Sequence, residues 1–283
     1  MPELPEVECV RRSLSMLEGG LVESVAVARR DFVSAPSERE RRHPMAGASI
    51  ERIDRLGKEL ALVEKGPRRL RMRLGMTGRL LVHPVAGRRA PARRPHEHVR
   101  WRIRTAAGST VLLRSIDPRR FGDLVVFDSA EAFEADRRRL GPDALAVRSA
   151  DLHRRLAGTR RAIKIALLDQ GVLAGVGNIY ADEALFASRI HPRTPSNRLD
   201  PPSVDRLARA VRRLLRRAIE DGGTTIRDYR NGRDEPGTAQ RHLLVYGRGG
   251  HPCRRCQGVL QHAFLGQRTT VWCSNCQQSV HMT

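Results

Sequence analysis

The stretch Leu70-Arg71-Met72-Arg73-Leu74-Gly75-Met76 alternates apolar side chains with arginine or glycine. Successive side chains of a β-strand point to opposite faces, so this period of two predicts a strand with one face in a core. Similar runs, separated by Gly and Pro, cover residues 22–27, 50–63, 70–82, 99–105, 110–116 and 124–127. Several short strands of this kind predict an antiparallel β-sandwich or barrel.

Helical patterns lie on both sides of the strands. Val7, Val10, Leu14 and Leu17 recur at helical spacing, and Gly19-Gly20 ends that pattern. Beyond Glu131 the period again becomes helical, with helices expected at residues 151–156, 163–169, 180–188 and, capped by Ser203, 203–219. The fold class is therefore α+β, with a domain boundary expected between residues 127 and 134.

The C-terminal part carries four of the five cysteines, as Cys253-x-x-Cys256 and Cys273-x-x-Cys276. Two such pairs on a hairpin predict a closed tetrahedral thiolate site for one structural Zn²⁺, and free or disulfide-bonded cysteines are the disfavoured alternative. Arg268 follows Gly266-Gln267, where the hairpin is expected to turn. There its guanidinium could hold a phosphate or remain solvated. Cys9 lies apart and is interpreted as a core residue.

The charge of the chain limits its partners. The 283 residues carry a net charge of +21, almost entirely from arginine, because Lys58, Lys65 and Lys164 are the only lysines. Such an excess favours a polyanionic partner, most simply nucleic acid. The sequence has no apolar run of membrane-spanning length and no secretory signal, so we expect a cytoplasmic protein that does not bind membranes.

The N-terminus reads Met1-Pro2-Glu3-Leu4-Pro5-Glu6. If Met1 is removed, Pro2 carries a secondary amine, which can attack a carbonyl-like carbon and form an iminium. Glu3 or Glu6 could then move protons. The alternative is a solvated, disordered terminus.

Two tight turns carry side chains suited to entering a duplex. Asp117-Pro118-Arg119-Arg120-Phe121-Gly122 places an arginine and an aromatic residue between strands, and Gly75-Met76-Thr77-Gly78 adds a flexible apolar side chain. Apolar wedges with an arginine could hold a duplex after a base has been extruded. Alternatively, Met76 and Phe121 are ordinary core residues.

The stretch Gly175-Val176-Gly177-Asn178 precedes an expected helix, which Asn178 is placed to cap. Such a junction can bind a phosphate. A dinucleotide site is the rival interpretation, but Tyr180 replaces the third glycine of that motif and the flanking segments are helical.

These motifs occur together in one known family, in the same order and over nearly the whole chain. They are Pro2-Glu3-Leu4-Pro5-Glu6-Val7-Glu8, Leu74-Gly75-Met76-Thr77-Gly78, Asp117-Pro118-Arg119-Arg120-Phe121-Gly122, Gly175-Val176-Gly177-Asn178-Ile179-Tyr180-Ala181 and the four-cysteine finger. With them the chain resembles the bacterial formamidopyrimidine-DNA glycosylases, which excise oxidised purines such as 8-oxoguanine. The resemblance implies an N-terminal antiparallel β-sandwich with flanking helices (1–130), a helix–two-turn–helix domain with a lesion-capping loop (131–240) and a zinc-finger hairpin (241–283).

The resemblance also assigns the chemistry. Pro2 would attack C1′ of the damaged nucleotide, and Glu3 would protonate the deoxyribose oxygen and help to open the ring. Glu6 would support the site and its bound water, and Lys58 would contact the phosphate beside the lesion. An iminium at C1′ acidifies the C2′ proton, so β- and δ-elimination would follow and the protein would be a bifunctional glycosylase and abasic-site lyase.

The partner implied by the resemblance is duplex DNA containing a damaged base, bound by a monomer in the bacterial cytoplasm. Three residues would fill the gap left by the flipped nucleotide: Met76, Arg119, which would face the orphan base, and Phe121. Three others would hold DNA phosphates: His96, Asn178 and Arg268. For His96, a solvated imidazole is the alternative.

Other classes of function stay open at this point. The loop after Gly222-Gly223 has Thr238-Ala239 where relatives often carry aromatic residues, which bears on the choice of lesion. An endonuclease VIII-like enzyme for oxidised pyrimidines usually begins Pro-Glu-Gly-Pro-Glu, so Leu4 favours the purine branch. A non-catalytic damage-binding protein would bind lesions without cutting. A zinc-finger transcription factor fits poorly, because the finger has no recognition helix.

Overall fold

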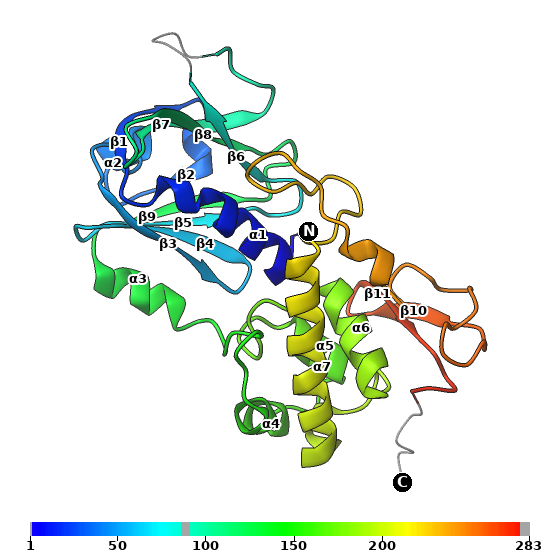
Figure 1. Ribbon diagram of the computed structural model, residues 1–283. Coiled ribbons are helices and arrows are strands. Elements are labelled where there is room, and N and C mark those ends of the chain that lie inside the picture. Colours follow the sequence, from blue (N-terminus) through cyan, green and yellow to red (C-terminus); the bar gives the residue numbers. More distant parts are fainter. Residues whose placement is uncertain (1, 86–90, 278–283) are drawn as a thin grey trace. The chain divides into compact units, whose positions relative to one another are not determined.

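The computed structural model describes residues 2–85 and 91–277, so Met1 lies outside the described residues. The chain divides into two compact units (Figure 1). The first consists of Met1–Arg138 and Asp221–Thr238, and the second of Arg139–Glu220 and Ala239–Thr283. The segment 221–238 therefore belongs to the first unit although it lies far from the rest of that unit in the sequence.

The first unit contains two β-sheets, with strand orders β1-β7-β8-β6 and β2-β9-β5-β4-β3. The strands are β1 (Leu21–Val27), β2 (Val33–Ser34), β3 (Ile50–Leu56), β4 (Glu59–Glu64), β5 (Arg69–Arg73), β6 (Arg79–Pro84), β7 (Glu97–Arg104), β8 (Thr110–Ile116) and β9 (Asp123–Phe127). The pairings are antiparallel, except that the short β2 runs parallel to β9. The α+β class with a β-sandwich is thus confirmed.

The alternation in the sequence sets the core of this unit. In β5, Leu70 and Met72 are buried, while the neighbouring Arg73 is exposed. Both sheets and the first helix contribute to one hydrophobic cluster. Trp101 of β7 is completely buried there, and its indole N–H donates to Pro44 O at 2.9 Å, so its polar atom is also satisfied.

The expected strand at residues 50–63 is a hairpin of β3 and β4. Leu56 pairs with Glu59, which leaves Gly57 and Lys58 as a two-residue turn. Gly57 has φ +57°, a conformation that glycine adopts without a Cβ penalty. The sequence pattern did not show this turn, because Gly-Lys is a weaker turn signal than Asn-Gly.

Short helices complete the first unit. They are α1 (Leu4–Leu14), α2 (Glu38–Arg42), α3 (Ala130–Arg137) and the 3₁₀ turns η1 (Ser15–Leu17) and η2 (Arg30–Phe32). Helix α1 packs on β3 and β4, with Val7, Val10 and Leu14 in the core. The predicted first helix is therefore confirmed.

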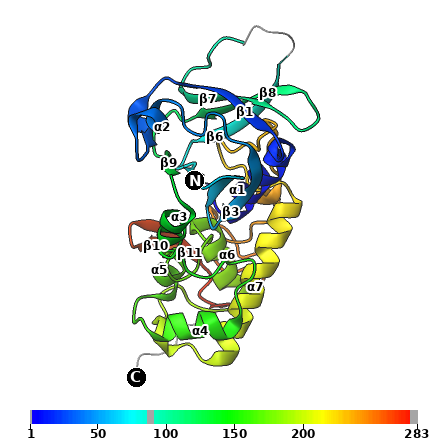
Figure 2. The ribbon, with the colours of Figure 1, turned by 90° about the vertical axis from the view of Figure 1, so that its left-hand side faces the viewer.

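The second unit is helical apart from its C-terminal hairpin. Its helices are α4 (Ser149–Ala157), α5 (Ile163–Leu168), α6 (Asn178–Ser188), α7 (Pro201–Glu220), η3 (Ser196–Arg198) and η4 (Ala239–His242). Helix α7 packs against α4 and α6 and is the longest element in Figure 2. The expectation that Ser203 caps α7 was wrong. The helix begins at Pro201, and Asp200 Oδ1 instead accepts from Ser203 N at 2.9 Å, as an Asp before a helix-starting Pro can do.

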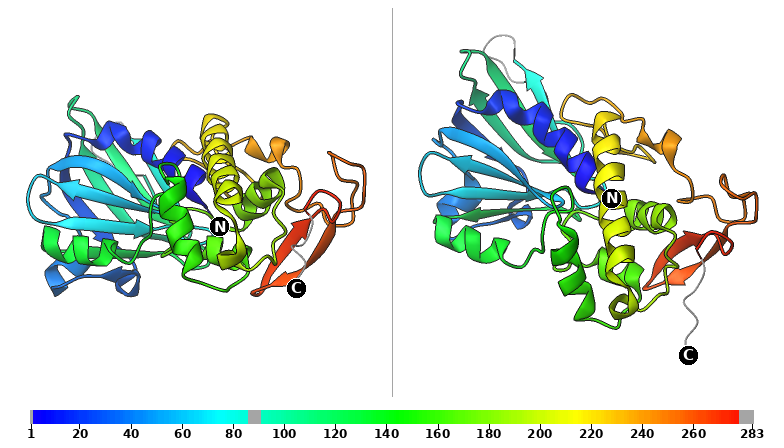
Figure 3. Two further views of the ribbon diagram at one scale, coloured as in Figure 1. Left: turned by 90° about the horizontal axis from the view of Figure 1, so that it is seen from below. Right: turned by 60° about the horizontal axis from the view of Figure 1, so that its bottom comes forward.

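The hairpin consists of β10 (Gln261–Leu265) and β11 (Arg268–Trp272). Gly266 and Gln267 form its turn with positive φ values of 56° and 61°, which confirms the predicted turn and the place of Arg268 directly after it. Strand β11 packs on α6 (Figure 3). Within residues 2–85 and 91–277, no helix is long and apolar enough to cross a membrane.

Candidate functional site

The N-terminal residues are buried and ordered, which contradicts the alternative of a solvated terminus. Pro2 is buried, and Glu3 is the N-cap of α1. The carboxylates of Glu3 and Glu6 lie in the first turn, where the positive end of the helix dipole favours negative charge. Two carboxylates are therefore fixed within one turn of the candidate amine.

Glu6 joins the N-terminal residues to segment 221–238 of the first unit. Its Oε2 accepts from Glu3 N at 2.8 Å and its Oε1 accepts from Thr224 N at 2.7 Å. The hydroxyl oxygen of Tyr229 lies 3.2 Å from both Glu6 O and Gly222 O, and the hydroxyl donates a hydrogen bond to Glu6 O. Burial raises the pKa of Tyr229, so this hydroxyl stays protonated and remains a donor. The start of the chain is thus held against segment 221–238.

Lys58 lies in the β3–β4 turn and is half-buried. The adjacent Arg55 fixes this turn, because its Nη1 donates to Gly57 O at 3.2 Å and its Nε donates to Glu8 Oε2 of α1 at 3.2 Å. Strand β3 and the N-terminal helix are therefore tied together beside Lys58.

The turns 75–78 and 117–122 lie against each other. A Cβ on Gly75 would be 2.4 Å from the backbone carbon of Phe121, so only glycine permits this approach. Met76 is 39% exposed and Phe121 49% exposed, which excludes the alternative that they are core residues. The Arg119 guanidinium lies 4.6 Å from the centre of the Phe121 ring, within cation–π range. The three expected duplex-probing residues are thus brought together on two turns.

Asp117 organises these turns, although sequence reasoning did not single it out as a site residue. It is buried, and its Oδ1 accepts from Thr77 Oγ1 at 2.6 Å and from Arg119 N at 3.2 Å. Its Oδ2 accepts from Gly122 N at 2.8 Å. The available signal was the Asp-Pro pair that opens the turn, since Asp side chains often accept hydrogen bonds from turn backbone N–H groups.

His96 is exposed beside this arrangement. Its backbone carbonyl accepts from Asp117 N at 3.0 Å, and its φ of 60° places it in the left-handed region. The neighbouring His98 is buried instead, with Nε2 2.8 Å from Asp117 O. The fold therefore directs one of the two histidines to solvent and the other into the support of the 117–122 turn.

In the second unit, Asn178 and the strand that begins at Arg268 are joined. Asn178 Nδ2 donates to Thr269 O at 3.0 Å, and Arg268 is exposed at the end of the hairpin. The expectation that Asn178 caps α6 was wrong, because Gly177 is the N-cap in an extended conformation and Asn178 is the first helical residue. The Oδ1 atom of Asn178 is buried and has no protein partner among the described residues.

Two buried carboxylates of α6, those of Asp182 and Glu183, bind other segments of the second unit. Lys164 Nζ donates to Asp182 Oδ1 at 2.7 Å and to Thr269 O at 2.9 Å, while Asp182 Oδ2 accepts from Val271 N at 3.2 Å. Burial raises the pKa of Asp182 to about 7, although the Lys164 ammonium acts in the opposite direction. Lys164 and Asp182 thus fix β11, and with it Arg268, on α5 and α6.

Glu183 is the second of these carboxylates. It accepts from three successive backbone N–H groups, of Leu244, Val245 and Tyr246, at 2.8–3.0 Å. Burial raises the pKa of Glu183, while these N–H groups stabilise its charged form. Neither Lys164, Asp182 nor Glu183 was predicted, since no local pattern reveals such pairings.

The four cysteines converge as predicted. All four Sγ atoms lie within 4.8 Å of one another, and those of Cys256 and Cys273 are 3.4 Å apart. Sulfur atoms around one tetrahedral zinc at about 2.3 Å would be about 3.8 Å apart, so the cluster fits a single metal ion. Gln277 supports it by accepting from Cys273 N at 2.9 Å and donating to Ile190 O at 2.9 Å. Cys9 is buried elsewhere, as expected of a core residue.

Comparison with known proteins agrees with these features. Residues 1–124 match the formamidopyrimidine-DNA glycosylase N-terminal domain, and residues 140–230 match the formamidopyrimidine-DNA glycosylase H2TH domain. The formamidopyrimidine-DNA glycosylase of Thermomicrobium roseum is 43% identical, with 98% of this chain and 99% of the relative aligned. That of Chloroflexus aurantiacus is 38% identical, with 98% of each aligned.

Solved structures agree as well. A variant of the Lactococcus lactis enzyme in complex with DNA containing Fapy-dG superposes with a TM-score of 0.86 at 30% identity. The complex of the Lactococcus lactis enzyme with DNA containing an abasic site gives a TM-score of 0.85 at 30% identity. Each alignment covers 98% of this chain and 100% of the solved chain. The chain belongs to the formamidopyrimidine-DNA glycosylase family.

Proposed function

We propose that this protein is a DNA glycosylase of base-excision repair that acts on oxidised purines and also cleaves the resulting abasic site. The relatives carry the name of a DNA glycosylase, and related structures hold DNA with Fapy-dG or an abasic site. The net charge of +21 suits a DNA duplex as substrate. The observation that carries the proposal is the buried arrangement of Pro2, Glu3 and Glu6 at the start of α1.

The chemistry starts at the amine that removal of Met1 would free. The lone pair of Pro2 N forms a bond to C1′ of the damaged nucleotide while the base departs with its bonding electrons, and the base takes up the proton that Pro2 N loses. Glu3 protonates the deoxyribose ring oxygen, the C1′–O bond opens and an iminium forms between Pro2 N and C1′. Glu6 holds the backbone of Glu3 in place for this step.

The iminium then allows strand cleavage. It acidifies the C2′ proton, whose removal expels the 3′ phosphate by β-elimination, and δ-elimination expels the 5′ phosphate. Water finally releases the sugar fragment and regenerates the amine. Lys58, on its fixed turn, contacts the phosphate beside the lesion.

DNA binding is divided among the other site residues. Met76, Arg119 and Phe121 occupy the gap left by the extruded nucleotide, with Arg119 toward the orphan base. Phosphates are held by His96, Asn178 and Arg268. The exposed, joined turns that carry the first three residues support this assignment.

We propose zinc as the metal of the four-cysteine cluster, since four thiolates favour it. It would have a structural role, holding the hairpin that presents Arg268. We further propose a functional division into a catalytic domain (1–130), a helix–two-turn–helix domain with the lesion-capping loop (131–240) and a zinc finger (241–283). We also propose that the protein acts in the cytoplasm, at the nucleoid, because its proposed substrate is DNA.

Cleavage of a panel of duplexes with single lesions tests this function. We expect cutting at 8-oxoguanine and formamidopyrimidine sites, with phosphates at both ends of the gap. Preferential cutting at oxidised pyrimidines would instead indicate endonuclease VIII-like specificity. Binding to lesions without cleavage would show a damage-binding protein and refute the proposal.

A further inference from the structure

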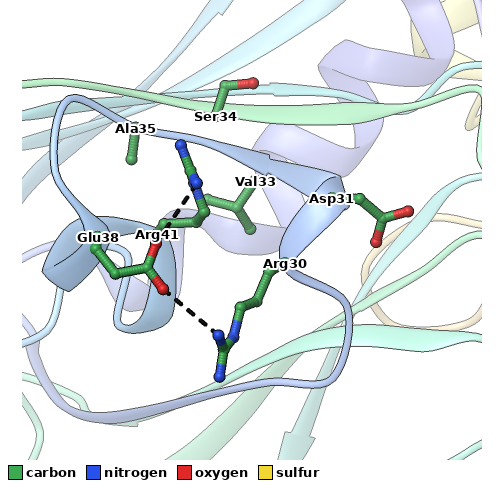
Figure 4. Close-up of a pocket in the computed structure, with 7 residues that line it drawn as sticks. All are labelled: Arg30, Asp31, Val33, Ser34, Ala35, Glu38 and Arg41. Carbon is green, nitrogen blue, oxygen red and sulfur yellow. Dashed lines mark hydrogen bonds and ion pairs between the residues drawn. The ribbon is translucent and has the colours of Figure 1, made fainter.

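The first unit has a cluster of arginines around Glu38, outside the N-terminal residues and the turns 75–78 and 117–122. A surface hollow of about 590 Å³ lies between η2, β2 and α2 (Figure 4). We call it the arginine hollow, and it is lined by Arg30, Asp31, Val33, Ser34, Ala35, Glu38 and Arg41. The Arg30 and Arg41 side chains lie on either side of Glu38.

Three guanidiniums compete for the carboxylate of Glu38. Arg42 Nε makes the short contact, 2.8 Å from Oε1. Arg41 Nη1 and Arg30 Nη1 lie 3.4 and 3.5 Å from the same carboxylate, beyond the usual length of an N–H···O bond. Each guanidinium has five N–H donors, and Glu38 is the one side-chain acceptor that these two contact among the described residues. Most of their donors therefore remain available to a ligand.

Arginines next to the lining residues add positive charge around the hollow. Asp31 of the lining pairs with two further arginines, Arg29 at 3.0 Å and Arg120 at 3.4 Å. Together with the three arginines around Glu38, five guanidiniums face two carboxylates, which leaves an excess of three positive charges. An anion with several oxygens can occupy such a site, because it offers two acceptors to a guanidinium fork.

The hollow is also connected to the duplex-probing residues. Arg120, which pairs with Asp31, directly follows Arg119 and precedes Phe121 in the 117–122 turn. Because Asp31 lines the hollow, a duplex held by that turn would have its backbone close to the hollow. We propose that Arg30 and Arg41 bind a backbone phosphodiester of the DNA that flanks the lesion. The inference rests on the proposed DNA-repair function.

Binding measurements with matched variants test this subsite. The test variant is Arg30→Ala/Arg41→Ala, and the control is Arg52→Ala/Arg137→Ala, which removes the same charge from exposed, ion-paired arginines of the same unit. The probe is a fluorescent duplex with one tetrahydrofuran abasic analogue, titrated at several NaCl concentrations. Loss of one phosphate contact should weaken binding about 3- to 10-fold at low salt and reduce the slope of log K against log[salt] by about 0.9. The control variant should lose less affinity at low salt, and its slope of log K against log[salt] should change less.

A second experiment locates the phosphate. Duplexes carrying a neutral methylphosphonate at one backbone position at a time are bound by wild type and by the test variant. We expect one position that weakens wild-type binding and has no further effect on the variant. Equal salt slopes for test and control variants, or no position coupled to the arginines, would overturn the proposal. Stabilisation of wild type by millimolar inorganic phosphate without any coupled position would also overturn it, because the hollow would then bind free anions.

An excision assay distinguishes failure of this inference from failure of the proposed function. At saturating enzyme, the control variant Arg52→Ala/Arg137→Ala should excise a lesion at the wild-type single-turnover rate, since neither arginine lies at the hollow or at the proposed catalytic site. If wild type excised no lesion, the proposed function would fail, and the two binding experiments would still decide whether the hollow holds a phosphate.

Discussion

Glu6 Oε1 accepts a hydrogen bond of 2.7 Å from the backbone N–H of Thr224, a residue 218 positions later in the chain. The other oxygen of the same carboxylate holds Glu3 N at 2.8 Å. One buried carboxylate therefore fixes both the N-terminal residues and the start of segment 221–238. This arrangement explains why a terminal Pro-Glu stretch is ordered, and it supports the proposal that Glu6 is a positioning residue for the amine.

Glu6→Gln should lower both the stability of the protein and the rate of excision, and the two effects can be measured separately. An amide offers one oxygen where the carboxylate offers two, so one of the two backbone N–H groups loses its acceptor, at a cost of about 1–3 kcal/mol of unfolding free energy. Misplacement of Glu3 and Pro2 should slow single-turnover excision by roughly 100-fold. Urea denaturation and single-turnover kinetics on an 8-oxoguanine duplex measure the two effects.

Glu8→Gln is the control for this prediction. Glu8 is also buried on α1, but its carboxylate pairs with Arg11, Arg12 and Arg55. We expect Glu8→Gln to lower stability with little change in the excision rate. Equal loss of rate in both variants would contradict a specific role for Glu6.

Phe121→Ala should impair excision without unfolding the protein. Phe121 is 49% exposed, so removal of its ring should change the unfolding free energy by about 0.5 kcal/mol or less. Excision should slow because the gap left by the extruded nucleotide is no longer filled. A fluorescent base opposite the lesion, such as 2-aminopurine, reports whether the gap is filled.

Phe133→Ala is the matched control, because Phe133 is buried in α3. It should cost about 3–5 kcal/mol of stability while the folded fraction excises normally. The interpretation of Phe121 as a wedge would be wrong if the two variants showed the same loss of stability.

Cys273→Ser should release the metal. We expect about one zinc per wild-type chain and much less in the variant, because a thiolate site of this kind needs all its ligands. DNA affinity should fall as the hairpin no longer presents Arg268. Cys9→Ala, which removes the cysteine outside the cluster, should keep its metal. Elemental analysis decides the point, and unchanged zinc in Cys273→Ser would refute the assignment.

Asp182 predicts a specific pH dependence of stability. Burial raises its pKa to about 7 in the folded protein, above the value of about 3.9 expected for an unfolded chain. The contribution of Asp182 to the unfolding free energy is therefore fully present below about pH 4 and is lost as the pH rises through 7. Each pKa unit of difference between the folded and unfolded protein corresponds to about 1.4 kcal/mol. The double variant Lys164→Met/Asp182→Asn removes the titrating group and keeps an acceptor for Val271 N.

The unfolding free energy of wild type should fall relative to that of this double variant between about pH 4 and pH 7, measured by chemical denaturation. Asp151→Asn is a control of opposite sign, since the Arg148 guanidinium lowers the pKa of Asp151 and that contribution is lost as the pH falls. Parallel pH profiles for wild type and the double variant would show that folding does not raise the pKa of Asp182.

Local patterns in the sequence predicted much of this fold. The alternation around Leu70 and Met72 indicated a strand with a buried face, and Gly266-Gln267 marked the hairpin turn before Arg268. Cysteine spacing predicted the cluster, because two CxxC pairs leave few other arrangements. These signals act over a few residues, so they can be read without a structure.

Contacts between distant residues could not be predicted in this way. Lys164 and Asp182 pair through 0% and 1% exposed side chains, yet either residue alone would be expected at the surface. The contact of Glu6 with Thr224 depends on segment 221–238 returning to the first unit. The role of Asp117 was missed for the same reason, because its hydrogen bonds to Thr77 and Gly122 form only when two turns meet.

Borohydride trapping on an oxidised-guanine duplex tests the central claim most directly. Intact mass first establishes that Met1 has been removed, and the protein is compared with a form whose N-terminus is extended so that the Pro2 nitrogen remains an amide. We predict a covalent protein–DNA adduct with the free terminus and none with the extended form, which keeps all three lysines. Full trapping by the extended form, or no adduct with the free terminus, would contradict the assignment of Pro2 as the nucleophile.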